Sequence, residues 1–152
     1  MTEVLFYHLE KRSLDEVLPG LVERALARGW RVLIQSESAE RAQAIDNLLW
    51  TWKEDSFLPH AQAGDGDPAL QPVLIAVEGG NPNGADVLFL AGGAGHSSWQ
   101  EAAAFVRVVV LFDGRDASAL RAARTAWIAV AECGHDATYW KQSADGRWNK
   151  QA

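Results

Sequence analysis

The chain has 152 residues and a mass of 16.6 kDa, which suits a single compact domain. Apolar residues make up 48% and charged residues 22%, the balance of a globular protein that can bury a core. The net charge of −6 excludes a generally basic protein that coats nucleic acid. The charge is uneven, however, because residues 121–152 carry five basic and three acidic side chains. An anionic partner is therefore expected to bind near the C-terminal end.

The sequence contains few signs of a targeting segment or a metal-binding site. One cysteine, Cys133, excludes an intramolecular disulfide and a cysteine-based zinc site, so a reducing compartment fits. The four histidines show no metal-ligand spacing, and we expect neither metal nor cofactor. No basic segment followed by a long apolar run opens the chain, and no run approaches the ~18 apolar residues of a membrane span. The prediction is a cytoplasmic protein without a membrane contact.

Five short runs are apolar throughout rather than alternating, and they are rich in β-branched residues. This pattern predicts strands that are covered on both faces, as in a largely parallel sheet. The runs are residues 4–7, 32–34, 73–76, 87–90 and 106–112.

Helical patterns separate these runs. The first helix is predicted after Ser13, which forms a capping box with Glu16, and Pro19 predicts a kink or a helix in two pieces. A second helix is predicted at roughly 38–52 and an Ala-rich third at roughly 116–132. The order of elements predicts an α/β fold with helices packed on both faces of the sheet.

The connection between the third and fourth apolar runs is short and turn-like. Residues 78–84 contain three glycines, two asparagines and a proline, which predicts that strands 73–77 and 86–91 pair as a hairpin. The sheet is then mixed but mostly parallel, in a Rossmann-like single domain over residues 1–152. Residues 142–152 can form a flexible tail of that domain.

The Gly-rich stretch from Gly92 to Ser98 follows a predicted strand, where α/β folds cradle phosphates. It lacks the lysine of a P-loop and the position of a dinucleotide loop, which belongs after the first strand. A small nucleotide-binding α/β enzyme that uses Gly92–Ser98 remains the alternative to a binding protein. No serine elbow or paired carboxylate points to a catalytic residue.

The third helix carries the clearest functional pattern. One side is apolar and suited to the sheet, and the adjoining ridge consists of Arg121, Arg124 and Ile128, with Trp127 three positions after Arg124. Arginines beside an aromatic surface suit a short peptide that is both acidic and aromatic. An ordinary amphipathic helix with solvated arginines gives the same spacing. Direct binding of single-stranded DNA by tryptophans is a third possibility, but it needs a basic track, which the sequence lacks outside its last segment.

Several blocks, in order along essentially the whole chain, resemble the chi subunit family of bacterial DNA polymerase III holoenzyme. They are Phe6-Tyr7-His8-Leu9, Gly29-Trp30-Arg31-Val32-Leu33, Leu48-Leu49-Trp50, Ser56-Phe57-Leu58-Pro59-His60, Gln71-Pro72-Val73-Leu74-Ile75, Phe112-Asp113-Gly114, Ala123-Arg124-x-x-Trp127 and Gly134-His135-x-x-x-Tyr139-Trp140 through Gly146-Arg147-Trp148.

The resemblance implies a non-catalytic accessory subunit of the clamp-loader assembly that acts in DNA replication. In that family the subunit connects the psi subunit to single-stranded DNA-binding protein, whose acidic tail ends in Phe, so DNA is reached only indirectly. The resemblance places the tail site at Arg124 and Trp127. The family's lysine after the aromatic is replaced by Ile128, and a later basic position by Ala131. Weak, more apolar tail binding is expected unless Arg121 and Lys141 compensate.

The resemblance also implies a surface for a psi-type partner in the block from residue 50 to residue 60. Large apolar side chains gather there just before a polar loop, which is typical of a partner site. The alternative is that these side chains simply close the edge of the core. The predicted residues are Trp50, Phe57, Leu58, Pro59 and His60.

Overall fold

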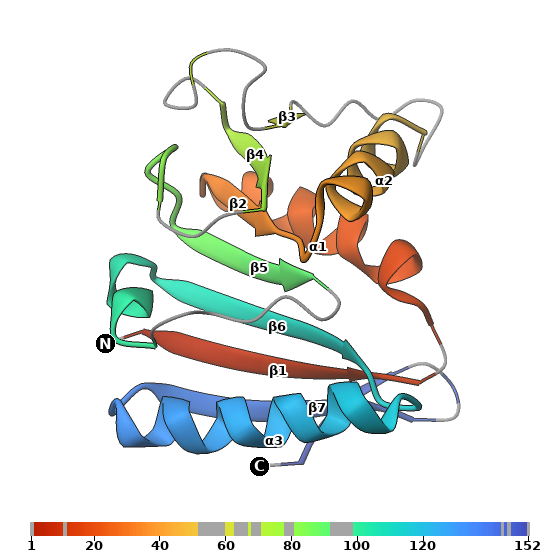
Figure 1. Ribbon diagram of the computed structural model, residues 1–152, viewed down its shortest axis with the longest axis vertical. Coiled ribbons are helices and arrows are strands. Elements are labelled where there is room, and N and C mark those ends of the chain that lie inside the picture. Colours follow the sequence, from red (N-terminus) through yellow and green to blue (C-terminus); the bar gives the residue numbers. More distant parts are fainter. Residues whose placement is uncertain are drawn as a thin grey trace.

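The computed structural model describes residues 2–10, 12–51, 60–62, 67, 71–77, 81–91, 99–143, 145 and 147–151. Strands and helices alternate along most of this chain (Figure 1). The strands are β1 (Glu3–Leu9), β2 (Val32–Gln35), β3 (Ala61–Gln62), β4 (Val73–Ala76), β5 (Val87–Ala91), β6 (Arg107–Asp113), β7 (Asp136–Gln142) and β8 (Trp148–Lys150). The helices are α1 (Leu14–Ala27), α2 (Ala39–Thr51) and α3 (Ala117–Glu132), with a 3-10 turn at Glu101–Ala104.

The strands form one sheet in the order β3-β4-β2-β5-β6-β1-β7-β8. All neighbours are parallel except β7 and β8. The predicted mixed, mostly parallel α/β sheet is confirmed. All five apolar runs lie in strands except for Val106, which precedes β6. Every residue of β2, β4 and β5 is buried, because helices or loops cover both faces of a parallel sheet.

The predicted hairpin is wrong. β4 and β5 do not pair with each other, because β2 lies between them: Val32 is opposite Val73 on one side and Val87 on the other. The connection instead returns to the amino ends of the strands. There the buried Asn83 donates hydrogen bonds from Nδ2 to the Val32 carbonyl at 3.0 Å and the Gln71 carbonyl at 3.1 Å. The turn-rich sequence was therefore a crossover between parallel strands.

α1 begins as predicted, with a capping box between Ser13 and Glu16. It is one continuous helix with Pro19 inside it, so of the two predicted alternatives, a kink or two pieces, the second is excluded. The proline ring is buried against the core, and this packing offsets the loss of one backbone hydrogen bond. Gly29, at φ 80°, then follows the last turn.

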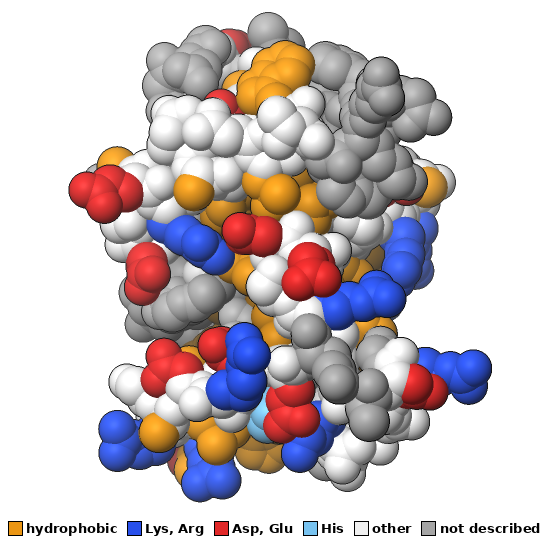
Figure 2. All heavy atoms as spheres, turned by 90° about the vertical axis from the view of Figure 1, so that its right-hand side faces the viewer, with side chains coloured by type: hydrophobic (Ala, Val, Ile, Leu, Met, Phe, Trp, Pro, Cys, Tyr) orange, Lys and Arg blue, Asp and Glu red, His pale blue; other side chains and the backbone are white. Residues whose placement is uncertain are grey.

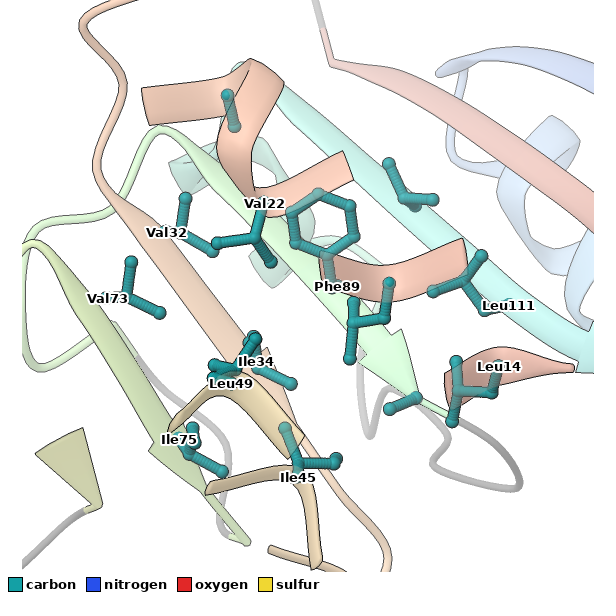
Figure 3. Packing of buried hydrophobic residues seen from close by; sticks show 14 of the residues in the cluster. Leu14, Val22, Val32, Ile34, Ile45, Leu49, Val73, Ile75, Phe89 and Leu111 are labelled. Atoms are coloured by element: carbon teal, nitrogen blue, oxygen red, sulfur yellow. The ribbon is translucent and has the colours of Figure 1, made fainter. Parts of the chain in front are cut away.

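The two faces of the sheet have separate cores. α1 and α2 cover one face, where Val22, Ile45 and Leu49 pack on strand residues such as Ile34 and Phe89 (Figure 3). α3 covers the opposite face beneath β6, β1 and β7 (Figure 1). β3, β7 and β8 are strands that the sequence did not predict.

α3 lies as its pattern predicted. Asp116 caps it by accepting hydrogen bonds from the amides of Ser118 and Ala119. The apolar side faces the sheet: Ala123 and Val130 are buried, while Leu120 and Trp127 are half-buried against the same core. The adjoining ridge of Arg121, Arg124 and Ile128 therefore faces solvent.

Candidate functional site

A groove of about 550 Å³ lies where α3 passes the carboxyl ends of β1 and β6. The chain leaves β1 toward α1 on one face and leaves the adjacent β6 toward α3 on the other. Such a reversal opens a crevice beyond the strand ends, the usual place for a ligand in an open α/β sheet. The groove is lined by His8, Glu10, Gly114, Leu120, Arg124, Tyr139, Lys141 and Gln151.

His8 is fixed at the base of this groove. Its Nδ1 lies 2.6 Å from the hydroxyl oxygen of Tyr139, and its Nε2 lies 3.1 Å from Oε1 of Glu10. The histidine is 6% exposed, and its ring fills the space where Gly114 lacks a side chain. Tyr139, Glu10 and Gly114 thus hold a single imidazole in place.

The upper part of the groove is charged. Nζ of Lys141 lies 3.5 Å from Oε1 of Glu10, and the exposed Arg124 reaches the groove from α3. Burial raises the pKa of the Tyr139 hydroxyl above its ordinary value, while the nearby Arg124 acts in the opposite direction. Arg124 and Lys141 are the two cations of the groove that can bind a carboxylate. Figure 2 views this edge of the sheet and shows blue and red side chains around a pale-blue histidine at its lower end.

The predicted tail residues do not all line the groove. Arg124 does, whereas Arg121 is exposed on the next turn outside it. Trp127 is half-buried, with ring centroids 5.4 Å from Phe6 and 6.1 Å from Tyr139 in edge-to-face geometry. Its indole therefore joins the core to the groove wall. Ile128 is 60% exposed on the solvent side of the same helix.

Two of the five residues predicted for a psi-type partner are described by the structure. Trp50, in the last turn of α2, is 55% exposed, and its ring centroid lies 4.8 Å from that of His60. The side chain of His60 is fully buried, with Nε2 3.2 Å from Oδ1 of Asp46. Trp50 therefore offers an apolar surface, while the side chain of His60 is turned inward against Asp46. The other three, Phe57, Leu58 and Pro59, lie outside the described residues.

Sequence reasoning missed the base of the groove. His8, Glu10 and Tyr139 were not singled out, and only Lys141 was considered as a supplementary cation. A signal was present, since a polar residue at the end of an apolar run marks the carboxyl end of a parallel strand. The pairing of β1 with β7 was needed to bring these residues together.

Other classes of site receive no support from the described part of the chain. It holds no group of three or more His, Cys, Asp or Glu arranged for a metal ion. None of its helices is long and apolar enough to cross a membrane. The loop from Gly92 to Ser98, on which the nucleotide-enzyme alternative rests, lies outside the described residues.

Comparison with known proteins identifies the family of this chain. The chain is 28% identical over 90 residues to the "Probable DNA polymerase III subunit chi" of Rickettsia prowazekii (strain Madrid E), an alignment covering 59% of this chain and 54% of that one. It is 35% identical over 83 residues to the "DNA polymerase III subunit chi" of Escherichia coli (strain K12), covering 50% and 56%. The chain thus spans about half the length of these relatives. The family model for "DNA polymerase III chi subunit, HolC" matches residues 1–138. This chain belongs to the DNA polymerase III chi subunit family.

Proposed function

We propose that this protein is a non-catalytic accessory subunit that acts in DNA replication. It links the clamp-loader assembly to single-stranded DNA-binding protein by holding that protein's acidic, Phe-ending C-terminal tail. Membership of the chi family supports the role in the polymerase holoenzyme. The observation that carries the tail-binding proposal is the groove at the carboxyl end of β1, because Arg124 enters it beside a second cation and a phenol.

The groove has the parts that such a tail requires. Arg124 and Lys141 provide charge-assisted hydrogen bonds for carboxylates. Leu120 and the edge of Trp127 provide apolar surface for a terminal ring. A chain-terminal carboxylate next to an aromatic side chain would use both parts at once.

Lys141 is a further cation that supports tail binding, and it does not lie on the helix that carries Arg124 and Trp127. It comes from β7 and compensates in space for a lysine that α3 lacks at Ile128. The compensation is incomplete, because Glu10 lies 3.5 Å from the Lys141 ammonium and partly neutralises it. The tail is therefore held with few cations, and the apolar contact of its ring contributes a larger share of the binding energy.

A second surface would face the clamp-loader side. The exposed Trp50 at the end of α2 gives a psi-type partner a large apolar anchor, and the buried pair of His60 and Asp46 holds its support in place. The groove and Trp50 lie at opposite ends of the sheet order, so both partners can bind together.

Calorimetric titration with a short acidic peptide ending in Phe tests the proposal. Saturable binding at low salt is expected, and Arg124→Glu should abolish it because the substitution places a negative charge in the groove. Arg115→Glu is the matched control, since Arg115 is exposed near α3 but does not line the groove. Absence of binding at low salt, or equal losses in the two variants, would refute tail binding in this groove. Amidation of the peptide's C-terminus should weaken binding if the terminal carboxylate is recognised.

A further inference from the structure

A second cavity, of about 360 Å³, lies on the opposite face of the sheet from α3. It is enclosed by the C-terminal half of α1 and by strands β1, β5 and β6. β1 contributes His8 to the groove described above and Tyr7 to this cavity, because successive side chains of a strand point to opposite faces. The two sites are therefore separated by the sheet.

The floor of the cavity is apolar. It is formed by Leu21 and Ala25 of α1 and by strand residues Val87, Phe89 and Val109. These side chains offer neither a hydrogen-bond donor nor an acceptor. A ligand part that enters deeply must therefore be an apolar ring or chain, because a polar edge would lose its bonds to water without replacement.

The rim is cationic. Arg24 and Arg28 are exposed at the end of α1, and neither forms an ion pair with any residue that the structure describes. Arg107 also lines the rim, but it is already bound to Glu3, with Nη2 3.0 Å from the carboxylate. Two guanidinium groups thus remain for an anion.

Arg28 is also held in place. Its guanidinium carbon lies 4.0 Å from the centre of the Trp30 ring, and that of Arg107 lies 5.1 Å from the same ring. Contact with an indole uses the face of a guanidinium and leaves its in-plane N–H groups for an anion. An arginine fixed in this way loses less conformational freedom on binding than an arginine extended into solvent.

Tyr7 supplies a neutral donor beside these arginines. Its hydroxyl makes no hydrogen bond to another described residue, and its ring stacks on that of Trp148 with centroids 4.7 Å apart. Burial raises the pKa of this hydroxyl, so it stays protonated at neutral pH. The hydroxyl can therefore donate to a bound oxygen.

We infer that this cavity binds a small organic anion in which a carboxylate is attached to an apolar ring. The ring fills the floor, and the carboxylate lies at the rim between Arg24, Arg28 and the Tyr7 hydroxyl. A nucleotide fits less well, since its base would place polar edges against the apolar floor. The same chemistry occurs in a free aromatic acid and in the last residue of a peptide that ends in Phe. This site is independent of the tail-binding groove.

Two-dimensional NMR of the full chain tests the inference with 3-phenylpropionate as the probe. Saturable shifts are expected at Arg24, Arg28, Trp30 and Phe89, and 3-phenylpropanol, the neutral analogue, should bind at least about tenfold more weakly. The double substitution of Arg24→Gln and Arg28→Gln should weaken the binding of 3-phenylpropionate by a similar factor. The control Arg115→Gln, at a residue that does not line the cavity, should leave its affinity unchanged.

Each remaining outcome decides a separate question. Tighter binding of N-acetyl-phenylalanine than of 3-phenylpropionate would point to a peptide terminus as the source, and the reverse order to a free acid. Equal affinity for the acid and the alcohol, tighter binding of deoxyadenosine monophosphate, or shifts confined to Arg124 and Tyr139 would overturn the inference. Loss of tail binding in Arg124→Glu bears on the proposed function and leaves this cavity untouched.

Discussion

Adding one methyl group at Gly114 should measurably destabilise the protein. A Cβ atom there would lie 1.7 Å from Nε2 and 2.0 Å from Cδ2 of His8, distances that no pair of atoms can keep. Gly114 is not one of the glycines with positive φ, so alanine fits its backbone and the effect is purely steric. The imidazole must move, and it is held on both sides by Tyr139 and Glu10.

The magnitude follows from three contributions. Overfilling a packed site costs about 1–3 kcal/mol. Displacing the His8 ring weakens two hydrogen bonds, each with a net value of about 0.5–1.5 kcal/mol. Replacing glycine restricts the unfolded chain and returns about 0.4–1 kcal/mol. Gly114→Ala should therefore lower the free energy of unfolding by about 3 kcal/mol, equivalent to about 6–12 °C in Tm for a chain of this length.

Urea denaturation followed by tryptophan fluorescence measures this change. Gly20→Ala is the matched control: Gly20 lies inside α1 with nothing within 4 Å of its added Cβ, and the same substitution should stabilise by about 0.5–1 kcal/mol. In a His8→Ala background, Gly114→Ala should cost close to nothing, since the clashing ring is gone. Equal stability of Gly114→Ala and the parent chain, or an undiminished cost without His8, would refute the packing described at this site.

Three further outcomes are expected. Tyr7 and Tyr139 are the only tyrosines, and burial raises the pKa of each above 10.0, so absorbance at 295 nm should show both ionising later in the folded than in the urea-unfolded chain. Their contribution to stability is complete below pH 10 and is lost as the pH rises through the raised folded pKa values; ionisation at the ordinary value would contradict this. Ile128→Lys should tighten binding of the acidic Phe-ending peptide by a factor of about 2–5 at low salt, with the gain lost at high salt, and a salt-independent gain would argue against an electrostatic cause. Asp116→Ala removes the cap that binds the Ser118 amide and should cost about 1 kcal/mol in thermal unfolding, whereas an unchanged Tm would show that the cap is dispensable.

Much of the fold could be predicted because a parallel strand that is buried on both faces is apolar at every position of its sequence. The run from Val73 to Ala76 is apolar at every position, and the structure buries every position. β7 has no such apolar run, because six of its seven residues are exposed or half-buried and its sequence mixes polar and apolar residues. The hairpin prediction failed for another reason: local turn residues do not specify which strand lies beside which.

The candidate site likewise has parts that the sequence could predict and parts that it could not. The ridge of Arg121, Arg124 and Ile128 depends only on helical periodicity, so its exposure was predictable. The His8–Tyr139 contact joins residues separated by 131 positions, and no local pattern specifies it. The cavity with Arg28 and Trp30 likewise depends on how α1 lies across the sheet, which sequence periodicity does not determine.

The position of β1 has a consequence for the order in which the chain can fold. β1 lies between β6 and β7, and its side-chain contacts span 104 positions to Arg107 and 131 to Tyr139. On the ribosome, β1 must remain unpaired until β6, which begins at Arg107, has been synthesised. The half built from β2, β4 and β5 has no such delay, because its strands are close in sequence. β1 would then complete both the sheet and the groove in one step, after β6 and β7 have been made.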